Sequence, residues 1–131
     1  MSGYFKWLKS IHQIILFFPD YFMSKRNSLS SPAYDLVPND IAGLIPGHGY
    51  TVKEPLVTVY LKWFTPDANW TWYITEMDRD KGICYGIVSG IETEWGTFTI
   101  EQVQKVRGSL GLPVERDLHF KPTLVSDLNI W

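Results

Sequence analysis

Residues 57–77 read VTVYLKWFTPDANWTWYITEM, and this stretch decides the predicted fold class. Apolar side chains alternate with others on both sides of the segment TPDAN. This period of two predicts one β-strand over residues 57–64 and a second over residues 70–77. Because TPDAN is rich in turn residues, the two strands are expected to form an antiparallel hairpin. The alternating apolar side chains are Val57, Val59, Leu61 and Trp63 on the first strand and Trp70, Trp72 and Ile74 on the second.

Turn segments divide the rest of the predicted sheet. DRDKG precedes a strand expected over residues 83–88, and SGIETEWG bends the chain before a short strand over residues 95–99. Residues 114–120, VERDLHF, are expected to return as an extended segment. Consecutive short strands joined by tight turns are typical of an antiparallel meander.

Two short helices are predicted beside these strands. Thr99 and Gln102 have the spacing of a capping box, which predicts a helix over residues 100–107. Asn39 is a suitable N-cap for a helix that ends near Leu44. The sequence therefore predicts an α+β domain, a small antiparallel β-meander of about four to five strands with short helices packed on one face.

Residues 1–22 differ in character from the rest of the chain. Apolar side chains recur at helical spacing until Pro19, which predicts a hydrophobic, amphipathic helix. The apolar run is too short for a transmembrane span, which needs about 20 residues. The helix can cover a face of the domain or a partner, or contact a membrane surface through residues 4–18, a role that nothing else in the sequence favours. Translation from Met23 would instead make it an upstream extension.

Composition limits the domain count and the class of partner. A chain of 131 residues has room for one domain, predicted over residues 36–131 after a linker at residues 23–35. Its 12 Lys and Arg against 14 Asp and Glu give a net charge of -2, which argues against a general polyanion binder. The single cysteine, Cys84, excludes an intrachain disulfide and predicts a buried thiol in a cytoplasmic protein. No cofactor is expected, because no G-x-S-x-G, H-E-x-x-H or Cys-x-x-Cys motif occurs.

One group of candidate chemical residues lies at positions 115–119. In an extended chain Glu115, Asp117 and His119 share one face, where they can bind a divalent metal or position an acid and a base. The structural alternative gives each a different role. Asp117 then caps a turn and His119 satisfies a buried carbonyl, while Arg116 pairs with Glu76 or Glu92.

Glu76 is a second candidate. It continues the alternation of Trp72 and Ile74, so its carboxylate is expected on the apolar face at the end of the strand. A buried carboxylate must be paired or raise its pKa. Glu76 is therefore either a general base or the partner of Arg116, and no nucleophile is evident beside it.

The aromatic residues of the sheet are a third feature. Trp70 and Trp72 are expected in the core, since a small sheet needs bulky side chains on its buried face. Tyr60, Phe64 and Tyr73 have the opposite parity. If no helix covers them, these rings together with Lys62 resemble a stacking platform for single-stranded nucleic acid.

Three stretches carry a resemblance to a known family. They are LVPNDIAGLIP, FTPDANWTWYITEMD and GIVSGIETEWGTFTIEQVQKVRGSLGLPVERDLHFKP, of which GLPVERDLHFKP is the most specific. Over residues 36–128 the chain resembles the bacterial domain-of-unknown-function family 2958. The resemblance implies a small α+β domain carried mostly on plasmids, phages and integrated elements, and it implies no particular catalytic activity.

The leading hypothesis is a non-enzymatic binding protein of a mobile genetic element that contacts a host or element-encoded protein, in an anti-defence or transfer role. Glu92 and Glu94 are expected at the polar rim of that interface. One alternative is a metal-dependent or acid/base enzyme that uses Glu76, Glu115, Asp117 and His119. The other is a single-stranded nucleic-acid binder. The predicted binding residues are Tyr60, Lys62, Phe64, Tyr73, Glu92, Glu94 and Arg116.

Overall fold

The computed structural model describes residues 31–49 and 56–131. The predicted N-terminal helix and residues 23–30 of the predicted linker lie outside the described residues. The elements in chain order are η2 (Pro32–Tyr34), α3 (Asn39–Ala42), β1 (Thr58–Val59), β2 (Leu61–Phe64), β3 (Thr71–Asp78), β4 (Ile83–Ser89), β5 (Thr93–Thr99), α4 (Ile100–Gln104), β6 (Glu115–Arg116), β7 (Thr123–Leu124) and η3 (Val125–Asp127). In the described part of the chain, no helix is long and apolar enough to cross a bilayer.

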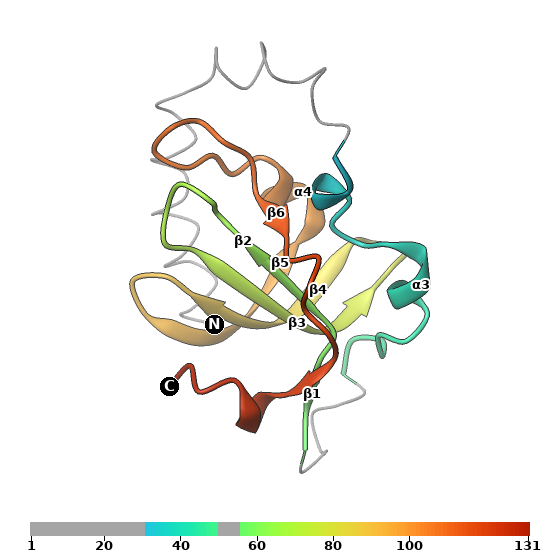
Figure 1. Cartoon of the computed structure of the whole chain (residues 1–131). Helices are drawn as coiled ribbons and strands as arrows, with labels where there is room; N and C mark the ends of the chain where they lie inside the picture. The colour runs from blue at the N-terminus through green and yellow to red at the C-terminus, as the bar shows by residue number, and fades with distance from the viewer. Residues whose placement is uncertain (1–30, 50–55) are drawn as a thin grey trace.

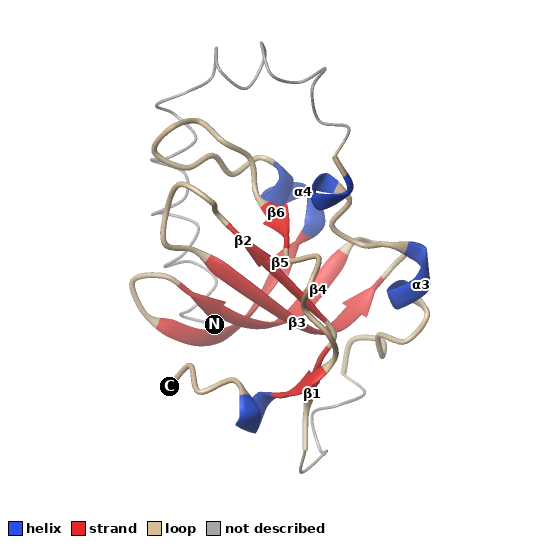
Figure 2. Ribbon diagram, viewed as in Figure 1, coloured by secondary structure: helices blue, strands red, loops and turns tan. Residues whose placement is uncertain are grey.

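A five-stranded antiparallel sheet forms the centre of the molecule, with the strand order β5-β4-β3-β2-β6 (Figures 1 and 2). The strands β2 to β5 are joined as consecutive hairpins, so the predicted antiparallel meander is confirmed. Strand β6 returns after α4 and pairs with β2. The short strands β1 and β7 pair in a separate two-stranded sheet. The helix after β5 begins with the predicted capping box, in which Thr99 and Gln102 satisfy each other's backbone N–H groups.

The main core lies on one face of the large sheet. Its largest fully buried side chains are Trp63, Trp72 and Phe98, and the ring of Trp63 meets that of Phe98 edge-on. The indole of Trp63 donates to the carbonyl of Leu36 at 2.8 Å, which ties the segment before α3 to the sheet. Trp70 stacks on Trp72 in the same core, so the expectation that both are core residues is confirmed.

The opposite face of the sheet is also partly covered, contrary to the expectation of packing on one face only. Val59, Tyr73 and Ile87 form a second buried cluster there. The C-terminal segment, which runs from β6 down to β1 and on to η3 in Figure 1, packs against this cluster. The packing residues are Phe120, Val125, Leu128 and Ile130.

The single predicted strand over residues 57–64 is broken at Tyr60. Val59 belongs to the second cluster and Leu61 to the main core, although strict alternation would place both side chains on one face. The chain changes direction at Tyr60, where β1 leaves the large sheet to pair with β7. Because of this break, Val59 lies on the face of the sheet that the C-terminal segment covers.

A β-bulge at Thr75 reverses the predicted direction of Glu76. Ile74 lies opposite Gly86, but Glu76 lies opposite Tyr85, so Thr75 is an extra residue in β3. A Cβ atom at Gly86 would lie 1.8 Å from the carbonyl oxygen of Tyr73, and therefore only glycine fits beside the bulge. Met77 takes the place on the main-core face that alternation assigns to Glu76, and Glu76 turns to the face of Tyr73.

The described part of the predicted linker, residues 31–35, is folded against the domain. Ala33 in η2 is buried, and the guanidinium of Arg116 donates to the carbonyls of Asp35 at 2.6 Å and Pro32 at 3.2 Å. The folded body of the protein therefore includes this segment.

Candidate functional site

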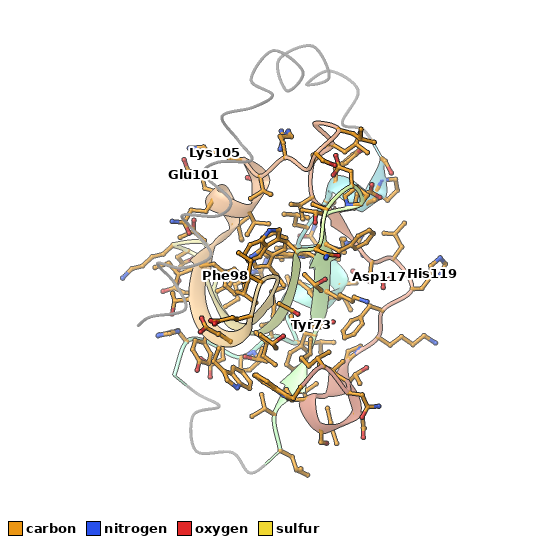
Figure 3. The ribbon with its side chains drawn as sticks, turned by 90° about the vertical axis from the view of Figure 1, so that its left-hand side faces the viewer. Tyr73, Phe98, Glu101, Lys105, Asp117 and His119 are labelled. Atoms are coloured by element: carbon orange, nitrogen blue, oxygen red, sulfur yellow. The ribbon has the colours of Figure 1, made fainter. Side chains whose placement is uncertain are left out.

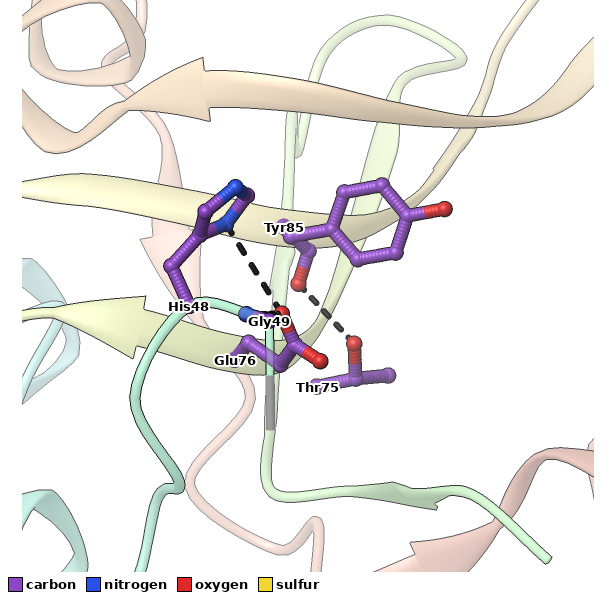
Figure 4. Close-up of polar contacts among 5 residues, drawn as sticks. All are labelled: His48, Gly49, Thr75, Glu76 and Tyr85. Carbon is purple, nitrogen blue, oxygen red and sulfur yellow. Dashed lines mark hydrogen bonds and ion pairs between the residues drawn. The ribbon is translucent and has the colours of Figure 1, made fainter. Parts of the chain in front are cut away.

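A buried carboxylate lies beneath the loop that follows α3. The side chain of Glu76 is 1% exposed, and its Oε1 atom accepts a hydrogen bond of 2.7 Å from the backbone N–H of Gly49 (Figure 4). The same oxygen lies 3.7 Å from Nδ1 of His48. Met77 donates its backbone N–H to the carbonyl of Pro46 at 2.9 Å, so two hydrogen bonds hold the loop against β3.

Local sequence features explain this arrangement. The bulge at Thr75 sends Glu76 toward the loop, and the Thr75 hydroxyl donates to the carbonyl of Tyr85 at 3.0 Å (Figure 4). Gly49 has a φ of +91°, a conformation that side chains with a Cβ rarely adopt. This conformation lets the loop point the Gly49 N–H toward the carboxylate of Glu76. Without such a hydrogen bond, burial of the carboxylate would be energetically unfavourable.

A row of three aromatic rings extends from this carboxylate toward the edge of the sheet. The ring of His48 meets that of Tyr85 edge-on at a centroid distance of 6.1 Å. The Tyr85 ring in turn stacks on Trp95 of β5 at 5.6 Å and an interplanar angle of 17°. Trp95 is 36% exposed and the His48 side chain is 53% exposed, so solvent reaches both ends of the group. We call His48, Glu76, Tyr85 and Trp95 the aromatic–carboxylate cluster.

The negative charge of Glu76 affects the pKa of Tyr85. Burial raises the pKa of Tyr85 above its ordinary value, and the negative charge of Glu76 raises it further. A phenolate beside a buried carboxylate would place two like charges in a medium that screens them poorly. The cluster therefore disfavours a second negative charge and favours a positive one.

Strand β5 forms the edge of the sheet next to this cluster. Two hydrogen bonds show which residues of β5 are hydrogen-bonded to β4. The N–H of Ile100 donates to the carbonyl of Gly82 (2.9 Å), and the N–H of Gly90 donates to the carbonyl of Glu92 (3.0 Å). Because such pairs alternate along an antiparallel ladder, every second residue of β5 points its backbone N–H and C=O toward β4, and the residues between point them away from the sheet. The inward residues are Glu94, Gly96 and Phe98, and the outward residues are Thr93, Trp95 and Thr97. Within residues 31–49 and 56–131, no strand pairs with the outer side of β5.

The residues expected to bind a metal or to perform acid/base chemistry do not converge. The ladder of β6 ends at Arg116, and Asp117 starts a turn in which its Oδ1 accepts the backbone N–H of His119 at 2.9 Å. His119 is exposed (Figure 3), and the turn-capping role of Asp117 is confirmed. Glu115 lies opposite Phe64 and hence in line with Thr71, whereas Glu76 lies five residues further along β3, or ~16 Å of strand.

The other expectations for this group are corrected in the same region. In the part of the chain that the structure describes, no three His, Cys, Asp or Glu side chains are placed to hold a metal ion. Arg116 donates to backbone carbonyls of the segment before α3, rather than to Glu76 or Glu92.

The predicted aromatic platform is divided among three environments. Tyr73 is buried under the C-terminal segment, and Tyr60 packs against the main core. Phe64 and Lys62 line an open cleft of about 340 Å³, together with Asp117 and residues of the β2–β3 hairpin. The ammonium of Lys62 lies 3.7 Å from Oδ2 of Asp117 and 6.0 Å from the centroid of the Tyr73 ring. Because the C-terminal segment covers Tyr73, these residues do not form one exposed platform.

The predicted acidic rim lies beside β5. Glu92 is exposed in the turn between β4 and β5, and Glu94 is half-buried on β5. Sequence reasoning selected Glu76 but did not select His48, Tyr85 or Trp95. A signal for Tyr85 and Trp95 exists in the β4–β5 hairpin, because both alternate with the buried residues of their strands. The contact of His48 depends on a loop and carries no local signal.

Comparison with known proteins adds the family. No curated protein and no solved structure matches the chain. One family model, described as a protein of unknown function (DUF2958), matches residues 51–130, which is more than half of the chain. The match includes strands β1 to β7, the capped helix α4, Glu76 and the β5 edge, and it leaves out η2, α3 and the loop at His48. The protein therefore belongs to the DUF2958 family.

Proposed function

We propose that this protein is a non-enzymatic binding module that docks another protein by pairing an extended segment of that protein with β5. The observation that carries the proposal is the row of outward backbone groups at Thr93, Trp95 and Thr97. Such a row is a template for an added strand, whose main-chain hydrogen bonds supply affinity while side-chain contacts supply specificity.

Apolar side chains beside the edge support the proposal. Ile91, in the turn before β5, is 80% exposed, and Trp95 on β5 presents part of its ring to solvent. Tryptophan is enriched at the centres of protein interfaces, because its large rigid surface is buried at a low cost in conformational entropy. An added strand would pass both side chains.

The biological setting belongs to the same proposal. The family resemblance suggests an accessory protein of a mobile genetic element, and its partner would be a host or element-encoded protein in an anti-defence or transfer process. Cytoplasmic residence is also proposed. It is supported by the buried, unpaired thiol of Cys84, which needs no oxidising compartment.

The test uses linear peptides selected from a random library on the full chain. Thr97→Pro removes one outward N–H and leaves the ladder with β4 intact, because proline is tolerated on the outer side of an edge strand. Thr97→Ala is the matched control, since it changes the side chain and keeps the N–H. The proposal expects Thr97→Pro to weaken the selected peptides about tenfold or more, and Thr97→Ala to bind them like the wild type. Equal binding by Thr97→Pro and wild type would refute it.

A further inference from the structure

We propose that the aromatic–carboxylate cluster is a binding site for an arginine side chain carried by the docked segment, an inference that rests on the proposed function. The cluster lies on the face of the sheet to which Trp95 projects from the edge strand. A segment paired with β5 would therefore bring its own side chains alongside it.

Ring geometry favours a planar cation. Tyr85 and Trp95 stack nearly parallel, so the face of Trp95 turned away from Tyr85 offers a flat aromatic surface rather than a cage. A guanidinium group is flat and weakly hydrated, and it stacks on aromatic faces more readily than a compact ammonium does. This geometry selects arginine over lysine.

Electrostatics favour the same ligand. The buried carboxylate of Glu76 lies 3.7 Å from the imidazole of His48, and its negative charge adds to the effect of burial in raising the pKa of Tyr85. The turn before β5 adds the negative charge of Glu92, and residues 83–101 contain no lysine or arginine. A positive side chain is attracted to such a surface, and a neutral side chain of the same shape is not.

Strand geometry determines which residue reaches the cluster. An added strand lies about 4.8 Å from β5, and its side chains alternate between the two faces of the sheet. Because the backbone groups of Trp95 point outward, the residue paired with Trp95 has its side chain on the cluster face. An arginine at that place is long enough to extend over Trp95 toward Tyr85.

The first experiment is an NMR titration of the full chain with N-acetyl-arginine-methylamide. Its matched control is the citrulline analogue, which replaces the guanidinium with a neutral group of nearly the same shape. The expected result is saturable shifts of the Trp95 indole N–H and the Gly49 amide, with affinity for the arginine compound at least about threefold higher than for citrulline. Equal affinity for the two compounds, or shifts confined to other residues, would overturn the assignment.

Two variants separate the parts of the site. Trp95→Thr removes a partly exposed ring without opening the core and is expected to abolish the preference for arginine. Glu76→Gln removes the charge and is expected to reduce the preference by about threefold or more in protein whose spectrum remains dispersed. Unchanged preference in Trp95→Thr would overturn the site even if Glu76→Gln fails to fold.

A second experiment distinguishes this inference from the proposed function. Arginine in the selected peptides is replaced by citrulline, and binding to wild type and to Thr97→Pro is compared. Peptides that depend on the Thr97 N–H but bind equally with citrulline would support strand pairing and refute the arginine site. Preference for the arginine compound without any effect of Thr97→Pro would support the arginine site and refute strand pairing.

Discussion

Replacing Glu76 tests whether its carboxylate anchors the loop over the sheet. The side chain is 1% exposed and accepts a hydrogen bond of 2.7 Å from Gly49. A hydrogen bond to a charged group contributes about 1.5–3 kcal/mol to the free energy of unfolding, and removing one buried partner also leaves the other without a hydrogen bond. We therefore expect Glu76→Ala to lose about 2–4 kcal/mol of the free energy of unfolding. Glu76→Gln keeps an acceptor but loses the charge, and we expect it to lose about 1–2 kcal/mol.

Urea unfolding followed by tryptophan fluorescence measures these losses. At a slope of about 1.5 kcal/mol per M, a loss of 3 kcal/mol lowers the midpoint by about 2 M. The exposed Asp80 provides a control, because Asp80→Asn is expected to change stability by less than about 0.5 kcal/mol. Glu76 variants as stable as the wild type, or more stable, would refute the anchoring role. Such a gain is typical of a residue kept for activity at the expense of stability.

Three further predictions concern other parts of the molecule. Asp67 holds the loop after α4 by accepting hydrogen bonds from the backbone N–H groups of Leu110 (2.7 Å) and Leu112 (3.1 Å). Asp67→Ala should therefore lower the free energy of unfolding by about 2–4 kcal/mol in the same urea titration, and Asp67→Asn should lower it less. Urea midpoints equal to that of the wild type would contradict this role of Asp67. Burial raises the pKa of the Cys84 thiol to about 12, so only about one thiol in 10,000 is ionised at pH 8, and iodoacetamide should label Cys84 in urea but not in the folded protein. The pKa of Tyr85 is raised above 10 in the folded state, so the free energy of unfolding should fall as the pH rises above 10. Glu76→Gln should lower the pKa of Tyr85 and leave it above the ordinary value, because burial still raises it. A Tyr85 ring resonance that titrates identically in the variant and the wild type would disprove the contribution of Glu76.

Local patterns were sufficient to predict much of the fold. The alternation around TPDAN predicted the β2–β3 hairpin, and the capping box at Thr99 predicted where α4 begins. Both signals act between residues close in sequence, so no knowledge of the rest of the chain was needed. The break at Tyr60 and the covering of Tyr73 depend on the C-terminal segment, which is distant in sequence, and alternation alone could not reveal them.

The candidate site was only partly predictable for the same reason. The sequence alone indicates that Glu76 needs a partner, because a carboxylate among the apolar residues of a strand must be satisfied. Its face was predicted wrongly, because the bulge at Thr75 shifts the alternation by one residue and depends on close approach to Gly86. Its partners at His48 and Gly49 come from a loop, and the pairing predicted with Arg116 was wrong because that guanidinium is used by the segment before α3.

Amide hydrogen exchange on a complex with a selected peptide tests the docking edge most directly. The account predicts that the N–H groups of Glu94, Gly96 and Phe98 exchange slowly in the free protein, and that those of Thr93, Trp95 and Thr97 exchange quickly. When the peptide binds, exchange of the second group should slow by about tenfold or more. Fast exchange at Thr93, Trp95 and Thr97 in the saturated complex would show that the peptide binds elsewhere and would contradict strand pairing on β5.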